Sequence, residues 1–175
     1  RTEWLRTEAE AARRRERSTR ALYEFSKEIA AVVDLNQILQ GIVRQAAETI
    51  NRTVSVLLPA DNGNLTLSAK HEPTRLSRTS AMIESAELEA ANWAHVHGQA
   101  AGRSTNTLSG VQSLYIPLIA SGQGIGVLGI QLDQKQVSPE EKRLIDAWAS
   151  LAALAIERVR LAEKAREAAL LSEAD

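Results

Sequence analysis

Hydrophobic positions first recur at helical spacing. Residues 1–33 contain no Gly or Pro, and their first twenty are mostly charged. The apolar positions near the end of this stretch are spaced three and four apart and form one stripe, Leu22, Phe25, Ile29 and Val32. This pattern predicts a helix that is solvated at its start and docked at its end. Asp34 is a good N-cap residue and is expected to open a second helix that ends near Asn51.

After residue 52, apolar and polar residues alternate with a period of two, which predicts two β-hairpins. Residues 53–58 and 65–69 flank the turn signal Asp61–Asn64, and residues 113–120 and 125–132 flank a turn over 121–124. Leu114, Ile116, Leu118 and Ala120 are expected on one face. Pro117 cannot donate to a strand ladder, so we expect an edge or a bulge there. Between the hairpins, a helix from about residue 80 to His97 should end at Gly98.

The last stretch predicts a long helix with a coiled-coil seam. Ser138 is the expected N-cap, Pro139 the first helical residue and Glu141 the partner that completes a capping box. No breaker follows. Apolar residues with one polar member then alternate at spacings of three and four: Leu144, Ala147, Leu151, Leu154, Arg158, Leu161, Ala165 and Ala168. Such a seam is typical of a helix that pairs with another.

This order of elements predicts an α+β fold with an antiparallel sheet and helices packed on it. We divide the chain into a signalling helix (1–33), a core (34–137) and a C-terminal helix (138–175). The chain begins with Arg1 and ends in helical sequence, so we expect a piece of a longer protein.

Composition and net charge exclude several kinds of site and classes of function. The 175 residues carry a net charge of −1 and no Cys, which excludes disulfides, thiolate metal sites, thiol nucleophiles and thioether-linked chromophores. Near-neutral charge argues against nucleic-acid binding. No apolar run reaches the length of a membrane span. His71, His95 and His97 lack the neighbours of a metal site, so we expect neither metal nor cofactor.

Three other motifs have a structural and a functional interpretation. Gly124, Gly126 and Gly129 have the spacing of a dinucleotide loop but lie in an expected hairpin, where turns and close helix–sheet contact explain them better. The run Arg13-Arg14-Arg15-Glu16-Arg17 is more simply a solvated face than a lipid-headgroup contact. The polar segment with Arg103, Ser104, Thr105 and Thr107 either satisfies its own loop backbone or lines a small-ligand pocket.

Two groups of residues carry a family resemblance. Ile116-Pro117-Leu118 and Ile125–Gly129 resemble the central hairpin of GAF domains, and Ser138–Glu141 with Ala152–Arg158 resembles their closing helix. The second group looks like the GAF region of KdpD-type sensor histidine kinases: Ala21-Leu22-Tyr23, Asp34-Leu35, Trp93, His97-Gly98, Ala101-Gly102-Arg103 and Thr105–Leu108. Ala100 and Asn106 depart from the Pro and Asp that are frequent in that family.

This resemblance implies a GAF-like sheet with helices on both faces and the long terminal helices packed together. It also implies an upstream membrane region, a downstream kinase dimerisation domain, a response to potassium limitation and osmotic stress, and a place on the cytoplasmic side of an inner-membrane bacterial receptor. The phosphoacceptor and ATP-binding regions are not in these residues, so we expect no catalysis from them.

Two functions remain in competition. A sensor module would bind an unidentified small ligand in a cleft lined by Trp93, His97, Arg103, Ser104, Thr105, Thr107 and Tyr115. A purely structural relay would fill that cleft with its own side chains. Both predict a homodimer through the terminal helices, with candidate interface residues Leu22, Phe25, Ile29, Leu144, Leu151, Leu154 and Leu161.

Overall fold

The first helix is longer than its sequence predicted. The computed structural model describes residues 2–73 and 83–174, with side chains for all of these except 2–5, 24–34 and 173–174. Helix α1 (Thr2–Ile50) runs without interruption through Asp34, so the expected start of a second helix there is wrong. A good N-cap residue does not end the helix before it, and the sequence around Asp34 holds no Gly or Pro that would.

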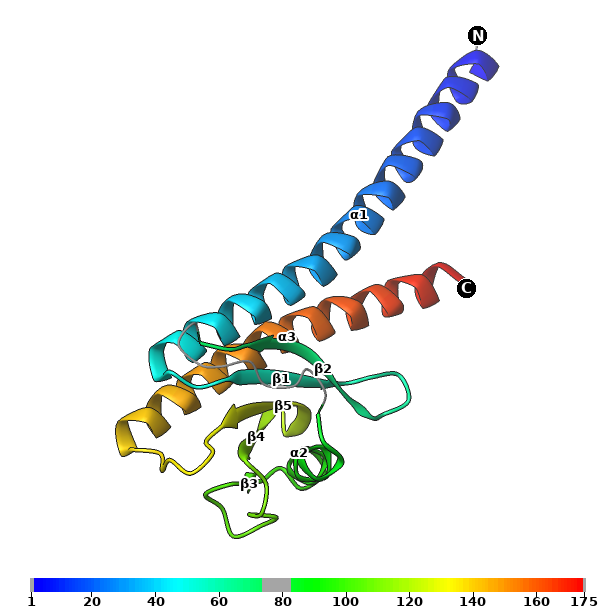
Figure 1. Cartoon of the computed structure of the whole chain (residues 1–175). Helices are drawn as coiled ribbons and strands as arrows, with labels where there is room; N and C mark the ends of the chain where they lie inside the picture. Colours follow the sequence, from blue (N-terminus) through cyan, green and yellow to red (C-terminus); the bar gives the residue numbers. More distant parts are fainter. Residues whose placement is uncertain (1, 74–82, 175) are drawn as a thin grey trace. The chain divides into compact units, whose positions relative to one another are not determined.

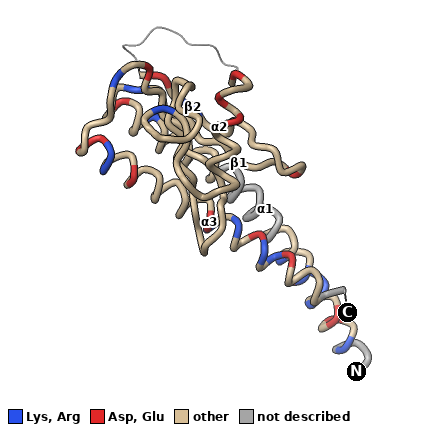
Figure 2. The backbone as a smooth tube through the Cα atoms, turned by 90° about the horizontal axis from the view of Figure 1, so that it is seen from below, with Lys and Arg blue, Asp and Glu red and all other residues tan. Residues whose placement is uncertain are grey.

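Contacts divide the chain into Arg1–Asp34 and Leu35–Asp175. In the first unit every described side chain, from residue 6 to residue 23, is exposed, including Leu22 at 68%. Arg20 pairs with Glu16 one turn away at 3.7 Å. Figure 2 shows how basic and acidic positions follow one another along this helix. The side chains of Phe25 and Ile29 lie outside the described residues.

The second unit is built on a five-stranded antiparallel sheet with the order β2-β1-β5-β4-β3 (Figure 1). Both expected hairpins form. The first joins β1 (Val54–Pro59) to β2 (Leu65–His71), and the second joins β4 (Ser113–Ala120) to β5 (Gln123–Gln131). The two-residue strand β3 (Ala101–Gly102) pairs with β4 at one edge. Because β5 pairs with both β1 and β4, it lies at the centre.

One face of the sheet carries the main core. The last four turns of α1 and the helix α3 (Pro139–Ala174) contribute to one hydrophobic cluster with the alternating aliphatic residues of β1, β4 and β5. The predicted run on β4 lies on this face, with Leu118 buried and Leu114, Ile116 and Ala120 packed against the cluster. Leu39, Val43, Leu128 and Ile145 are among its fully buried members. This face is filled by Leu, Ile and Val side chains together with six alanines.

The other face carries α2 (Ser85–His97). Its buried residues are Ala90, Ala91 and Ala94, and they pack against a smaller cluster that includes Leu57, Tyr115 and Val127. Gly98 ends the helix in the left-handed conformation, with φ 65° and its N–H bonded to the carbonyl of Ala94, which confirms the expected C-terminal glycine. Helices therefore cover both faces, as the α+β prediction required.

Close backbone approach explains the glycine spacing on β5. A Cβ atom at Gly124 would lie 2.8 Å from the carbonyl oxygen of His95 on α2, and one at Gly126 would lie 2.9 Å from that of Leu57 on β1. These glycines allow helix–strand and strand–strand contact, and the dinucleotide interpretation is excluded by their position inside a strand.

The expectation for Pro117 is also confirmed. Strand β3 pairs with β4 only at Leu114 and Tyr115, so Pro117 lies beyond the paired part of that edge. The register between β4 and β5 then shifts between Leu118 and Ile119. Proline is tolerated at such a place because its missing N–H interrupts no ladder.

The beginning of α3 is fixed to the end of α1. The hydroxyl of Ser138 accepts a hydrogen bond from the N–H of Glu141 at 3.1 Å, so the predicted cap forms. The Glu141 carboxylate accepts from Nε of Arg52 at 3.0 Å, while the other guanidinium nitrogens donate to the carbonyls of Leu132 and Gln136. Burial by itself raises the pKa of Glu141, but the bonds from Arg52 and Ser138 outweigh it and hold that pKa below its ordinary value.

Helix α3 has apolar stripes on two faces. Ile145, Ala149, Ala152 and Ile156 are buried against the sheet. On the opposite side, about half a turn away at 3.6 residues per turn, the predicted seam faces outward. Its leucines are exposed by 41% to 58%: Leu144, Leu151, Leu154 and Leu161. The seam therefore has no role in the core of the described chain.

Candidate functional site

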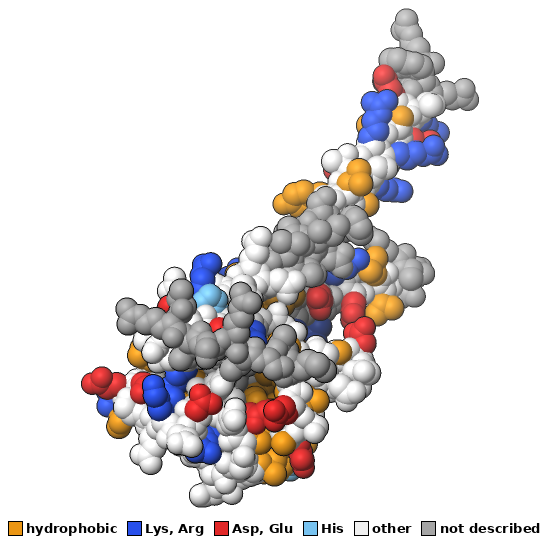
Figure 3. All heavy atoms as spheres, viewed as in Figure 1, with side chains coloured by type: hydrophobic (Ala, Val, Ile, Leu, Met, Phe, Trp, Pro, Cys, Tyr) orange, Lys and Arg blue, Asp and Glu red, His pale blue; other side chains and the backbone are white. Residues whose placement is uncertain are grey.

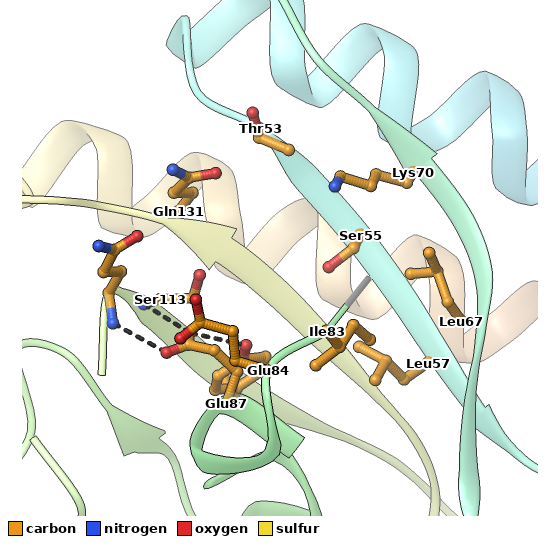
Figure 4. A pocket seen from close by; sticks show the side chains of 12 residues that line it. Thr53, Ser55, Leu57, Leu67, Lys70, Ile83, Glu84, Glu87, Ser113 and Gln131 are labelled. Atoms are coloured by element: carbon orange, nitrogen blue, oxygen red, sulfur yellow. Dashed lines mark hydrogen bonds between the residues drawn. The ribbon is translucent and has the colours of Figure 1, made fainter. Parts of the chain in front are cut away.

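A pocket opens on the α2 face of the sheet, beside Tyr115. Its volume is about 280 Å³. We call it the Tyr115 pocket, and Figure 4 shows how its side chains come from β1, β2, β4, β5 and the start of α2. The lining residues are Thr53, Ser55, Leu57, Leu67, Lys70, Ile83, Glu84, Glu87, Gln112, Ser113, Tyr115 and Gln131.

The polar floor of the pocket is a result of strand alternation. On β1, Val54 and Val56 point into the main core, so Ser55 and Leu57 point to the opposite face and line the pocket. On β2, the register shifts opposite Val56 and Leu57. Leu65 and Ala69, which simple alternation would place on one face, therefore belong to clusters on opposite faces, and Lys70 lines the pocket.

Glu87 connects α2 to the sheet at this site. Its carboxylate accepts hydrogen bonds from the backbone N–H groups of Gln112 and Ser113, at 3.0 and 3.2 Å, and from the Tyr115 hydroxyl at 3.0 Å. Burial, together with the charge and the hydrogen bond of Glu87, raises the pKa of Tyr115 far above its ordinary value of 10.0. The hydroxyl therefore stays protonated and keeps donating to Glu87.

The pocket holds one cationic and two anionic side chains. Lys70 lies 3.7 Å from the carboxylate of Glu72, measured from nitrogen to oxygen. Glu84 occupies the N-cap position of α2 but makes no capping hydrogen bond with its side chain. Figure 4 shows Lys70 near Thr53 and Ser55, with Glu84 and Glu87 projecting from the start of α2. The pocket can thus offer donors and acceptors at separate places.

Gly129 keeps this floor open at the centre of the sheet. A Cβ atom there would lie 2.6 Å from the Ser55 hydroxyl oxygen and 3.0 Å from the Tyr115 ring. A larger residue would have to move the Ser55 hydroxyl and press against the Tyr115 ring, so glycine at this position leaves room for both pocket side chains.

The structure separates the residues that the sequence proposed for the cleft. Tyr115 lines the Tyr115 pocket, whereas Trp93, His97 and Thr107 line an open groove on the outer side of α2. The Trp93 and His97 rings stack there with centroids 4.2 Å apart. Arg103, Ser104 and Thr105 line neither hollow. The Thr105 hydroxyl donates to loop carbonyls of Gly102 and Thr107, which is the structural alternative for this polar segment.

Most of the pocket was missed at the level of sequence. Ser55, Lys70, Glu87 and Gln131 were not candidates, because each is an ordinary polar residue in a strand or a helix end. The available signal was the polar side chain of Ser55 between Val54 and Val56, in a strand that is otherwise apolar. A buried strand with one polar position facing away from the core indicates a polar surface on its other face.

Within residues 2–73 and 83–174, no helix combines the length and the apolarity that spanning a membrane requires. In the same described part of the chain, no group of three or more His, Asp or Glu side chains is placed to share a metal ion. Acidic and basic side chains are interspersed on the visible face of the domain (Figure 3).

A family model for the GAF domain matches residues 34–158. This chain therefore belongs to the GAF domain family. It is similar to Sensor protein KdpD of Escherichia coli (strain K12), at 32% identity over 98% of this chain, and to Sensor protein KdpD of Clostridium acetobutylicum, at 22% identity over 93%. The chain covers 18% of the length of each of these relatives.

Solved structures agree with this assignment. The crystal structure of the native GAF domain of the potassium sensor histidine kinase KdpD from Escherichia coli matches with a TM-score of 0.55 and 26% identity, over 77% of this chain and 96% of that one. The blue-light absorbing form of the Thermosynechococcus elongatus PixJ GAF domain matches with a TM-score of 0.59 over 79% of this chain and 94% of that one. At 17% identity, the PixJ likeness concerns the fold alone.

Proposed function

We propose that this chain is the sensory module of a two-component sensor histidine kinase of the KdpD type. In this proposal residues 1–33 are a signalling helix that continues from an upstream membrane region, 34–137 are the sensory core, and 138–175 lead toward a kinase dimerisation domain. The chain then forms part of the cytoplasmic portion of an inner-membrane bacterial receptor. It has no catalytic role itself, because phosphoryl transfer belongs to the downstream kinase core.

The outward stripe of α3 is the observation that carries this proposal. A helix whose inner face is already buried against the sheet and whose outer face repeats leucine at heptad spacing is built to pair with a second helix. Homodimerisation through Leu144, Leu151, Leu154 and Leu161 would bring two output helices together. The similarity to KdpD proteins along nearly the whole chain supports this role.

The Tyr115 pocket supports the ligand-binding form of the proposal. The pocket lies on the face of the sheet opposite to α3, and β1 and β5 contribute side chains to both faces. A ligand that favours one arrangement of these strands would bias the packing of α3, which is the differential affinity that regulation requires. The alternative function is a structural relay, in which dimerisation matters and no ligand binds.

The dimer is tested in the full-length sensor and in the 175-residue chain with the double variant Leu151→Glu/Leu154→Glu. Burying two carboxylates at a helix pair should weaken dimerisation in analytical ultracentrifugation by at least about 100-fold. Stimulus-dependent autophosphorylation should be lost. Leu170→Glu makes the same substitution at a residue of α3 that is 53% exposed and lies on the opposite side of the helix from the seam, and it should change neither quantity. An unchanged dimer in the double variant would contradict the proposed interface.

A variant that fills the Tyr115 pocket distinguishes the two alternative functions, the ligand-binding sensor and the structural relay. Ser55→Leu adds bulk inside the Tyr115 pocket, whereas Ser109→Leu makes the same change in an exposed loop. A sensor should lose the stimulus response of its kinase in the first variant and keep it in the second. A relay should respond normally in both, provided that circular dichroism shows both variants to be folded.

A further inference from the structure

We propose that Arg158 makes the seam of α3 specific for a second copy of this chain and fixes the register of the two helices, by pairing with the partner's Glu157. The seam is the outward row of α3 that holds Arg158 among exposed leucines. The inference rests on the proposed dimer and names the residue that determines its register. It follows from one cation inside an apolar row and one carboxylate beside that row.

Arg158 interrupts the seam in its middle. It follows Leu154 and precedes Leu161 at the spacing that keeps all three on one side of the helix. Its side chain is exposed and makes no hydrogen bond or ion pair with the rest of the described chain. Covering a row of leucines also covers this guanidinium, which costs free energy unless a carboxylate meets it. The partner of the seam must therefore supply an anion at this level.

Glu157 provides a carboxylate at the edge of the same seam. Its Oε1 accepts a hydrogen bond from the Ser121 hydroxyl at 2.8 Å, in the turn between β4 and β5. Arg160, three residues on, donates to the Gln123 side chain at 3.4 Å, so this hairpin contacts α3 at two places. Ser121 is a neutral donor, which helps to position the carboxylate but leaves its charge uncompensated. A carboxylate can accept several bonds, so Glu157 can also accept from an arginine outside the domain.

A parallel pair of α3 helices brings these two groups together. In the heptad pattern, Arg158 is at an a position and Glu157 is at the g position just before it. An a residue of one helix lies against the a and g residues at the same level of the other helix. Arg158 would therefore meet the partner's Glu157, and twofold symmetry repeats the pair on the other side. One chain carries both members of the pair, which is why a second copy fits this seam.

Other registers leave the arginine without a carboxylate. The g positions in the other heptads of the seam are basic or neutral: Arg143, Ser150 and Lys164. A shift by one heptad would therefore place Arg158 beside a serine or a lysine. An antiparallel pair would place it opposite a d residue, and the d positions are apolar: Ala147, Leu154, Leu161 and Ala168. Only the parallel pair in register gives Arg158 an opposite charge.

The first test compares and mixes the 175-residue chain with its Arg158→Glu variant. Alone, the variant should dimerise about tenfold more weakly in analytical ultracentrifugation, because its new carboxylates face each other and the partner's Glu157. In an equimolar mixture, native mass spectrometry should show more heterodimer than random pairing gives, since each new carboxylate then faces an unmodified arginine. Arg103→Glu makes the same change in the loop after β3 and should leave both results as they are.

An exchange of charges separates pairing from packing. The double variant Glu157→Arg/Arg158→Glu keeps one cation and one carboxylate at the two positions in reversed order. Its dimer affinity should return to within about threefold of the unmodified chain, because the opposite charges meet again. Ser121→Ala removes the hydrogen bond that Glu157 loses in this exchange, and measures the contribution of that bond alone. Circular dichroism checks that each variant is folded.

An introduced thiol reports the register directly, because the chain contains no Cys. Ala165→Cys lies in the seam one heptad after Arg158 and should form a disulfide-linked dimer under mild oxidation. Adding Arg158→Leu makes the row apolar throughout, so the dimer should tighten while shifted registers become accessible and the linked fraction falls. Glu167→Cys places the thiol on the opposite side of α3, where no link should form.

Three results would overturn the inference. Random pairing in the mixture would show that Arg158 does not face its counterpart in a second copy. A charge exchange that restores no affinity, with Ser121→Ala unchanged, would show that Glu157 is not its partner. A dimer that Leu151→Glu/Leu154→Glu weakens and no Arg158 variant alters would refute the register and leave the proposed interface standing. An unmodified chain that stays monomeric would refute both.

Discussion

The two faces of the sheet are filled to different extents. On the α1 and α3 side, a large cluster of Leu, Ile, Val and Ala residues fills the space between helices and strands. On the α2 side, the helix presents three alanines, the cluster is smaller, and a polar pocket interrupts it. Close-packed interiors have low compressibility and transmit strain. In the proposed sensory function, a ligand in the pocket would therefore act on the packed face through the strands that both faces share.

The largest expected effect comes from truncating one leucine on each face. Leu128 and Leu57 are both fully buried and lie on opposite faces. Leu128→Ala should lower the free energy of unfolding by about 3–4 kcal/mol, since the packed core cannot collapse around the space. Leu57→Ala should cost about 2 kcal/mol, because it enlarges a pocket that water already reaches.

Urea unfolding measures the loss in free energy of unfolding for each variant, and the difference between the two losses tests the comparison between the faces. Equal losses would mean that the two faces are packed to the same density. A larger loss at Leu57 would reverse the comparison between the faces.

The connection between α1 and α3 gives the next effect. Arg52→Met removes the guanidinium that binds Glu141 and two carbonyls, and should cost about 2 kcal/mol. This loss of stability is smaller than the loss expected for a fully buried ion pair, because the Glu141 side chain is 28% exposed to solvent. Arg20→Met is the matched control, since its pair with Glu16 is 72% exposed on both sides and should contribute less than about 0.5 kcal/mol. Similar costs for the two arginines would show that the Arg52 contact is no more than a surface pair.

On the pocket face, removing a single hydroxyl tests how α2 is held. Tyr115→Phe leaves Glu87 bound to two backbone N–H groups and should cost about 1 kcal/mol. Hydrogen exchange in α2 should become faster while exchange in α3 stays the same. Faster exchange in both helices would mean that the two faces do not behave as separate parts.

The smallest effect is a dependence of stability on pH. The pKa of Glu141 is lower in the folded chain than its ordinary value of 4.5, so its contribution is fully present above pH 4.5. That contribution is lost as the pH falls through the folded pKa. Glu141→Gln should therefore flatten the stability profile below pH 4.5, as followed by thermal unfolding. A profile that keeps its slope would assign the acid sensitivity to other groups.

Much of the fold could be predicted because its signals are local. The cap at Ser138, the glycine after His97, the two hairpins and the single apolar face of β4 all depend on residues close together in the chain. Asp34 shows the limit of such signals. Its preference for an N-cap is small compared with the hydrogen bonds that continue α1 through it.

The pocket could not be predicted in the same way. Trp93, His97 and Thr107 belong to a polar and aromatic segment that looks like a binding site, yet they lie together on the outer side of α2. The residues that line the Tyr115 pocket come from five elements, and their meeting depends on the strand order and on the register shift in β2.

The sequence by itself determined most of the elements, their antiparallel pairing and the resemblance to GAF domains, because periodicity, caps and turns act over a few residues. Only the tertiary structure decided which of the two apolar stripes of α3 is buried and which polar side chains share a cavity. Both depend on what a face meets in space: the sheet covers Ile145 and Ile156 and leaves Leu151 and Leu154 exposed. The same sheet brings Lys70 and Glu87 to one pocket.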